Sequence, residues 1–183
     1  MKITDIINAD RPSLSFEVFP PKTSDNFESV MGAAGEIAAL KPSYMSVTYG
    51  AGGGTSGYTA EIASRLFSMG VTPLAHLSCI SATHATIRER LDDLRARGIE
   101  NILALRGDIP KDFDSSKLEY HYACELASEI RDYGGFCVGG ACYPESHPDS
   151  LNSASDIEAL RVKVESGCEF LTTQMFFDNN ILY

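Results

Sequence analysis

The first strong pattern of apolar and polar positions is the stretch Leu14-Ser15-Phe16-Glu17-Val18-Phe19-Pro20-Pro21-Lys22. Apolar residues recur at every second position, which is the period of a β-strand, and the two prolines end it. Glu17 therefore lies on a strand between aromatic neighbours. A carboxylate in that setting must be paired, protonated or functional, because an unpaired charge in apolar surroundings is costly. Glu17 is for this reason a candidate general acid.

Strands and helices alternate along the rest of the chain. Further strands are predicted at residues 44–49, 73–79, 101–106, 136–143 and 170–177, and helices at 25–40, 57–69, 83–97, 118–133 and 154–165. Ser24 is the predicted N-cap of the first helix, and Gly98 is a natural residue to follow the third. The units repeat about every 28 to 35 residues, which is typical of βα units with parallel strands.

Polar residues fall within or just beyond the C-terminal halves of these strands: Glu17, Thr48, His76, Asp108, Glu145 with His147, and Gln174. A (β/α)8 barrel assembles its active site at this rim from several strands, whereas an open doubly wound sheet uses one switch point. The spread therefore favours an α/β fold of the (β/α)8 TIM-barrel type. About six of the eight βα units of such a barrel are present.

The absence of a linker-like segment predicts that residues 1–183 form a single, partial barrel domain. Either the chain is a fragment or its sheet stays open. An incomplete barrel exposes two unpaired strand edges, which favour association, so we expect a homo-oligomer.

The amino-acid composition limits the classes of molecule that the protein is expected to bind. Lys and Arg total 15 against 25 Asp and Glu, and a net charge of -10 argues against nucleic acid or an anionic membrane. A small-molecule ligand is expected. No apolar run approaches the roughly 20 residues of a membrane span, and the N-terminus lacks a signal peptide's apolar segment, which predicts a cytoplasmic protein. The five cysteines form no CxxC pair and the four histidines no HExxH motif, so we predict buried free thiols and no metal site.

Two motifs have alternative interpretations. The loop Gly50-Ala51-Gly52-Gly53-Gly54-Thr55 could cradle a pyrophosphate, but Thr55 stands where the Rossmann pattern has its third glycine, so a pliable rim loop is the alternative. Glu17 and Asp108 could be the carboxylate pair of a glycoside hydrolase, although the chain has no Trp to form a sugar platform. Asp108 alone could instead cap a turn, and Glu145 and His147 could belong to a solvated loop.

Six segments together resemble the methylenetetrahydrofolate reductase family. They are, in order, Ser15–Lys22, Ser46–Ala51, Ala75–Cys79, Leu103–Asp108, Tyr143–Pro148 and Thr173–Asp178. The resemblance covers essentially the whole chain. It implies a flavin-containing (β/α)8 barrel that reduces 5,10-methylenetetrahydrofolate to 5-methyltetrahydrofolate, with FAD as cofactor and NADH or NADPH as electron donor.

The resemblance also implies roles for single residues. Glu17 matches the family's catalytic acid, Asp108 an aspartate beside the flavin and the pterin, and Gln174 an amide that orients the pterin. Thr48 matches a threonine that contacts the nicotinamide.

The positions that match FAD-lining residues are Tyr49, Ala51, His76, Arg106, Gly107, Tyr122, Ala123, Tyr143 and His147. Asp156 and Lys163 match residues that reach the adenine nucleotide part of FAD. The sequence departs from the bacterial pattern at Ala159 and Val162, where Asn and a basic residue are common, so binding at that end is expected to be looser or differently arranged.

Overall fold

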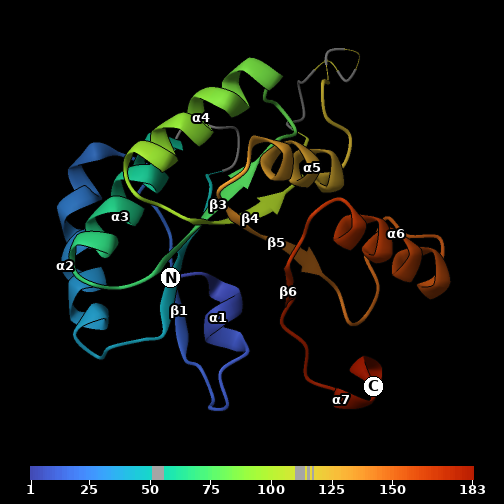
Figure 1. The fold of residues 1–183 in the computed structure, drawn as a ribbon, viewed down its shortest axis with the longest axis horizontal. Helices are drawn as coiled ribbons and strands as arrows, with labels where there is room; N and C mark the ends of the chain where they lie inside the picture. Colours follow the sequence, from blue (N-terminus) through green and yellow to red (C-terminus); the bar gives the residue numbers. More distant parts are fainter. Residues whose placement is uncertain (51–55, 110–113, 115, 117) are drawn as a thin grey trace.

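The structure is a computed structural model that describes residues 1–50, 56–109, 114, 116 and 118–183. Its elements alternate between strands and helices after a short N-terminal helix (Figure 1). In chain order they are α1 (Ile3–Ile7), β1 (Ser15–Val18), η1 (Ser24–Asn26), α2 (Phe27–Ala38), β2 (Tyr44–Val47), α3 (Ser56–Ser68), β3 (Pro73–Ser78), α4 (His84–Ala96), β4 (Asn101–Leu105), α5 (Ala123–Tyr133), β5 (Cys137–Cys142), α6 (Ser153–Glu165), β6 (Phe170–Thr173) and α7 (Asn179–Leu182).

One six-stranded sheet organises the molecule, and its strands lie in the order β1-β2-β3-β4-β5-β6. Every neighbouring pair is parallel, from Glu17 opposite Ser46 at one edge to Ala141 opposite Thr172 at the other. Strands that follow one another in sequence and in space, with a helix between each pair, form the curled part of a (β/α)8 barrel. This confirms the predicted fold class.

The outer face of the sheet packs against α2, α3, α4 and α5, and alternation along each strand decides which residues lie there. Ala75 and Leu77 of β3 belong to this core. Leu74 of the same strand points to the inner face and belongs to a separate cluster that also contains residues of α1. The helices contribute residues at helical spacing, such as Ile87 and Leu91 of α4, which are fully buried. This layer is the main apolar core of the described residues.

The inner face is closed at the N-terminal end of the strands by α1. Ile3 and Ile6 of this helix pack against inward residues of the sheet, namely Leu74, Leu103, Cys137 and Phe170. Gly139 of β5 makes room for the ring of Phe170, since a Cβ at residue 139 would lie 2.3 Å from the ring's Cζ atom. The inner end of the half-barrel is therefore filled by side chains.

Helix α6 is packed differently from the other outer helices. Asp156 is the one buried residue among those recorded for this helix, and Ile157 and Val164 are exposed. Its C-terminal end is tied to α5 by Arg131, whose guanidinium donates to the carbonyls of Glu165 and Ser166. Residues of α6 and β5 line a cavity that is described below.

Several predicted boundaries were wrong. The Ser24 hydroxyl donates to Asp25 and does not cap α2, which follows a 3-10 turn. Helix α5 begins at Ala123 rather than at residue 118, because the Glu125 carboxylate accepts the N–H groups of His121 and Tyr122 and so fixes the helix start.

Strand β6 ends at Thr173 rather than at residue 177. Its partner β5 ends at Cys142, and the last ladder bond runs from the Gln174 N–H to the Cys142 carbonyl at 2.7 Å. Helices α1 and α7 were not predicted.

Other predictions were confirmed. Gly98 has φ +75°, and the N–H of Ile99 donates to the Leu94 carbonyl at 3.0 Å, as expected for a residue that closes α4. The five cysteines are unpaired, and four of them, Cys79, Cys137, Cys142 and Cys168, are buried. Within the described part of the chain, no helix combines the length and apolar character that a bilayer crossing needs.

Asn101 at the start of β4 couples α1 to the sheet, which leads to a first prediction. Its side chain is buried, accepts from the Ile3 N–H at 2.9 Å and donates to the Pro73 carbonyl at 3.2 Å. Asn101→Ala leaves both groups buried without a partner, so we expect a loss of about 2–4 kcal/mol in the free energy of unfolding, measured with urea. Asn8→Ala, at an exposed residue with no side-chain bond to the described residues, is the matched control. Equal losses would contradict this role.

Candidate functional site

Three side chains from three neighbouring strands meet on the inner face of the sheet. The Ser46 hydroxyl of β2 donates to Glu17 Oε2 of β1 at 3.2 Å, and His76 Nε2 of β3 lies 3.6 Å from the same oxygen. Side-chain exposure is 45% for Glu17 and 9% for His76. The Glu17 carboxylate is thus partly exposed to solvent and lies beside two polar side chains, those of Ser46 and His76.

His76 is the buried member of this group. Its burial in the sheet lowers the pKa of the imidazole to about 4, because a buried cation loses its hydration. At neutral pH the ring is uncharged, so it lies beside Glu17 as a neutral polar group rather than as a cation.

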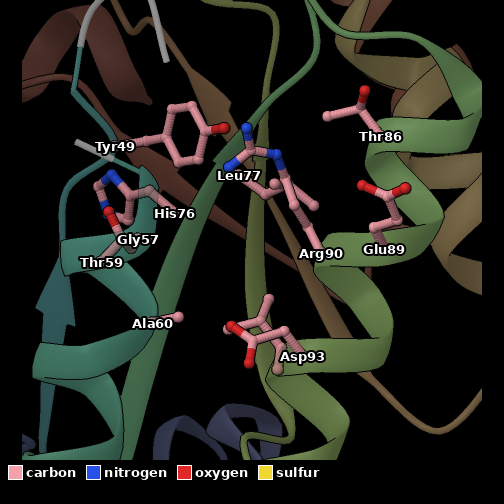
Figure 2. Close-up of a pocket in the computed structure, with 11 residues that line it drawn as sticks. Tyr49, Gly57, Thr59, Ala60, His76, Leu77, Thr86, Glu89, Arg90 and Asp93 are labelled. Carbon is pink, nitrogen blue, oxygen red and sulfur yellow. The ribbon is translucent and has the colours of Figure 1, made fainter. Parts of the chain in front are cut away.

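Tyr49 and His76 also border a cavity of about 240 Å³ between α3 and α4 (Figure 2). Arg90 of α4 reaches across this cavity, and its guanidinium carbon lies 5.3 Å from the centre of the Tyr49 ring. The Thr59 hydroxyl donates to the Thr48 carbonyl at 2.9 Å and fixes the end of β2 against α3. This arrangement holds Thr48 and Tyr49 at the rim.

The ends of β3 and β4 are joined through Arg106 and Gly107. Ser78 Oγ donates to the Arg106 carbonyl at 2.8 Å, and Gly107 follows with φ +83°. A Cβ at residue 107 would lie 2.1 Å from Ser78 Oγ, so a side chain there would break this contact. Glycine at this position lets the chain turn sharply at the rim.

A second cavity, here called the α6 cavity, has a volume of about 370 Å³. It is lined by Arg106, Tyr122, Ala123, Cys124, Ala141, Cys142, Tyr143, His147, Asp149, Ser150, Asp156, Ala159, Leu160, Val162 and Lys163. Seven of these are predicted cofactor residues, namely Arg106, Tyr122, Ala123, Tyr143, His147, Asp156 and Lys163. The structure therefore brings most of the predicted set to one place.

Charged groups in the α6 cavity are paired with the protein itself. Arg106 Nη2 donates to Asp149 Oδ2 at 3.1 Å, and the Ser150 hydroxyl donates to the buried Asp156 carboxylate at 2.8 Å. The Lys163 ammonium donates to the Ala141 carbonyl of β5. The cavity thus contains both cations and carboxylates beside an apolar wall.

Tyr120, two residues before Tyr122, anchors the part of the cavity wall that Tyr122 forms. Tyr120 is 1% exposed, and its hydroxyl donates to Glu129 of α5 at 2.5 Å. The Nδ1 atom of His84 at the start of α4 lies 2.6 Å from the same carboxylate oxygen. Burial raises the pKa of the Tyr120 hydroxyl, and its bond to Glu129 adds to the shift. This network fixes the segment that leads into α5.

Some predicted site residues do not meet. Glu17 lies on β1 and Gln174 just beyond β6, at opposite edges of the sheet. Asp108 is exposed and has no hydrogen bond or ion pair with the described residues. Ala51 lies outside the described residues. Across residues 1–50, 56–109, 114, 116 and 118–183, no cluster of three His, Cys, Asp or Glu suited to a metal ion is found.

Two residues of the site, Ser46 and Asp149, were not predicted from the sequence. Ser46 touches Glu17, and Asp149 touches Arg106. Ser46 could have been found, because it lies two residues before Thr48 and thus on the same face of β2. Asp149 gave no such signal, because it lies in an irregular loop that meets Arg106 only after folding.

Consecutive parallel strands with polar side chains at their C-terminal rim define the class of barrel enzymes that bind a ligand at this rim. Comparison of the sequence with models of known protein families identifies the family. A sequence model described as Methylenetetrahydrofolate reductase matches residues 2–183, so the chain belongs to the methylenetetrahydrofolate reductase family.

Individual relatives agree with this family. The chain is 36% identical to "Methylenetetrahydrofolate reductase (NADH) 1" of Arabidopsis thaliana over 98% of its own length and 33% of the plant protein. It is 37% identical to "5,10-methylenetetrahydrofolate reductase" of Pectobacterium carotovorum over 92% of its own length and 56% of that protein. The Escherichia coli protein of the same name is 36% identical, over 91% and 55%. The chain therefore spans between a third and somewhat over half of these relatives.

Among solved structures, the chain resembles a crystal structure of a mandelate racemase/muconate lactonizing protein from Paracoccus denitrificans PD1222 complexed with magnesium. The TM-score is 0.55 at 12% identity, over 94% of this chain and 43% of the other. At this identity the likeness concerns the fold alone.

The depressed pKa of His76 leads to a second prediction. Below pH 6.5 an unfolded chain protonates this histidine, whereas the folded protein resists protonation until about pH 4. Stability therefore falls as the pH drops through this window, by up to about 3 kcal/mol from this group. In His76→Gln that contribution is absent, so the difference in urea unfolding free energy between wild type and variant changes between pH 7 and 4.5.

The exposed Asn8, which carries no titratable group, provides the control, since Asn8→Ala should leave the pH dependence unchanged. Parallel stability curves for wild type and His76→Gln would contradict the burial argument.

Proposed function

We propose that this chain carries the flavin-binding and acid-catalytic part of a reductase that converts 5,10-methylenetetrahydrofolate to 5-methyltetrahydrofolate with NADH or NADPH. Family membership and the names of the relatives support the reaction. The single observation that carries the proposal is the convergence of seven predicted cofactor residues on the α6 cavity. The plant relatives are named as NADH enzymes, which favours NADH as donor.

The residues of the α6 cavity suit FAD. Arg106 and Lys163 offer cationic donors for phosphate oxygens, and Ala159, Leu160 and Val162 offer an apolar surface for a flat ring. When bound, the flavin would accept a hydride from NAD(P)H and deliver it to the folate. Gly107 carries no Cβ, and the structure has no room for one, so it would let the backbone at the end of β4 approach the cofactor closely.

Glu17 would supply the proton for the folate half of the reaction. Opening the five-membered ring of the substrate requires a proton at the leaving nitrogen, and a carboxylic acid is suited to deliver it. The Ser46 hydroxyl donates to Glu17 and orients it, and the uncharged His76 places no cation beside it. Of the other predicted residues, Thr48 would contact the nicotinamide, Asp108 the flavin and the pterin, and Gln174 the pterin.

A second candidate is a flavin-binding or assembly module without turnover. It is favoured by the lining of the α6 cavity, which contains seven predicted cofactor residues but neither Glu17 nor Gln174. A glycoside hydrolase is less favoured, since the sequence contains no Trp to form a platform for a sugar ring.

A spectrum separates these candidates, which is a third prediction. FAD added to the purified 183-residue chain should give a bound flavin absorbance, and NADH should bleach it. A bound yellow cofactor with no NADH consumption favours the module. Absence of binding contradicts the flavin assignment.

Glu17→Gln provides a fourth prediction. We expect flavin reduction by NAD(P)H to stay within about twofold of wild type and folate reduction to fall by about 10²-fold or more, because only the second half-reaction needs the acid. Rapid-mixing absorbance at the flavin band measures the two steps separately. Glu36→Gln, on the exposed face of α2, removes the same charge as a control. Equal losses in both half-reactions would exclude the acid role.

A further inference from the structure

Asp149 stands out among the residues of the α6 cavity, because it contacts two proposed cofactor residues and was assigned no role by the sequence. It lies in the loop between β5 and α6, and its side chain is 65% exposed. Its carboxylate accepts from Arg106 Nη2 at 3.1 Å, and its backbone N–H donates to His147 Nδ1 at 3.1 Å. One loop residue thus holds groups from the ends of two different strands.

The contacts of Arg106 fix the plane of its guanidinium. Nη2 is held by Asp149, and Nε donates to the Gly107 carbonyl at 3.3 Å. Within the described part of the chain, Nη1 has no hydrogen-bond partner, although Arg106 lines the cavity. Arginine presents its donors in a rigid fork, so fixing one side of the fork aims the other.

The same loop residue selects the tautomer of His147. Since Nδ1 accepts the Asp149 N–H, the neutral ring carries its proton on Nε2. The edge-on contact with the Tyr143 ring, with centroids 4.8 Å apart, fixes the ring position. His147 can therefore present a donor of defined position to a ligand in the cavity.

We propose that Asp149 is a positioning residue that orients Arg106, and with it His147, to bind the phosphate groups of an adenine dinucleotide. This inference rests on the proposed function, because it assumes that the ligand is a dinucleotide. The carboxylate itself does not touch the ligand. It forms an ion pair with Arg106 and leaves the remaining donors of the guanidinium free to bind phosphate oxygens.

Electrostatic repulsion between Asp149 and the ligand predicts the opposite change in affinity when Asp149 is removed, so the proposal can be tested. A carboxylate beside a phosphate site repels the ligand and competes with it for Arg106, so removing it should tighten binding. If positioning dominates, removing it weakens binding, because Arg106 must then be ordered by the ligand at an entropic cost. The direction of the change therefore decides between the two roles.

The test compares two variants with a matched control. Asp149→Ala removes the acceptor and should weaken binding of FAD and of ADP about fivefold, a modest effect typical of a partly exposed charged pair. Asp149→Asn keeps an acceptor oxygen and should bind within about twofold of wild type or more tightly. Glu36→Ala removes one charge from the exposed face of α2, at a residue outside the α6 cavity, and should leave binding unchanged. Calorimetry gives the affinities, and circular dichroism verifies folding.

Coupling to Arg106 provides the second measurement. In an Arg106→Gln background, Asp149→Ala should cost nothing further, because its target is gone. An equal cost in both backgrounds, or tighter binding by Asp149→Ala, overturns the proposal.

A readout without ligand separates this inference from the proposed function. In the ligand-free protein, NMR of the Arg106 Nε–H group should show faster guanidinium rotation in Asp149→Ala than in wild type or Asp149→Asn. If wild type binds neither FAD nor ADP but this difference is present, the dinucleotide assignment fails and the positioning of Arg106 stands. If rotation is unchanged, the positioning role is wrong regardless of ligand binding.

Discussion

The structure depends on the register of its parallel sheet. Because each strand is paired in parallel with the next, alternate residues of every strand point to the same side across the whole sheet. This constraint places Glu17, Ser46 and His76 on the inner face, while Val18, Val47 and Leu77 pack beneath the helices. A shift of one residue in any strand would exchange the apolar layer for the polar one. The site is therefore a product of the same pairing that forms the core.

The inner face has two levels with different contents. Near the N-terminal ends of the strands it is apolar and is closed by α1, whose Ile3 packs among Leu103 and Phe170. Toward the C-terminal ends it becomes polar, beginning with Glu17 and His76. The His76 side chain is 9% exposed, whereas the Glu17 side chain beside it is 45% exposed. This gradient gives two side chains less than 4 Å apart very different exposure to solvent.

Much of this arrangement could be predicted from the sequence. The alternation around Glu17 and the helical spacing of apolar residues were sufficient to place all six strands, because local periodicity reflects burial directly. The start of helix α5 was predicted wrongly, because it depends on the hydrogen bonds of Glu125. Tyr120, in the segment before the helix, is buried and so resembles an apolar position of a helix. Asp149 was missed for a related reason. Its partner Arg106 is 43 residues away in sequence, and loops carry no period that reports such contacts.

The loose seating of α6 has a consequence for the order in which parts of the protein open. The other outer helices are anchored by apolar side chains, but α6 is held chiefly by hydrogen bonds of Arg131 and Lys163 and by a buried carboxylate. We expect such a helix to form a cooperative unit of low local stability that detaches before the rest of the molecule unfolds. Its amide protons should exchange with solvent earlier than those of α4, and a ligand that bridges α6 to β5 would suppress this local opening.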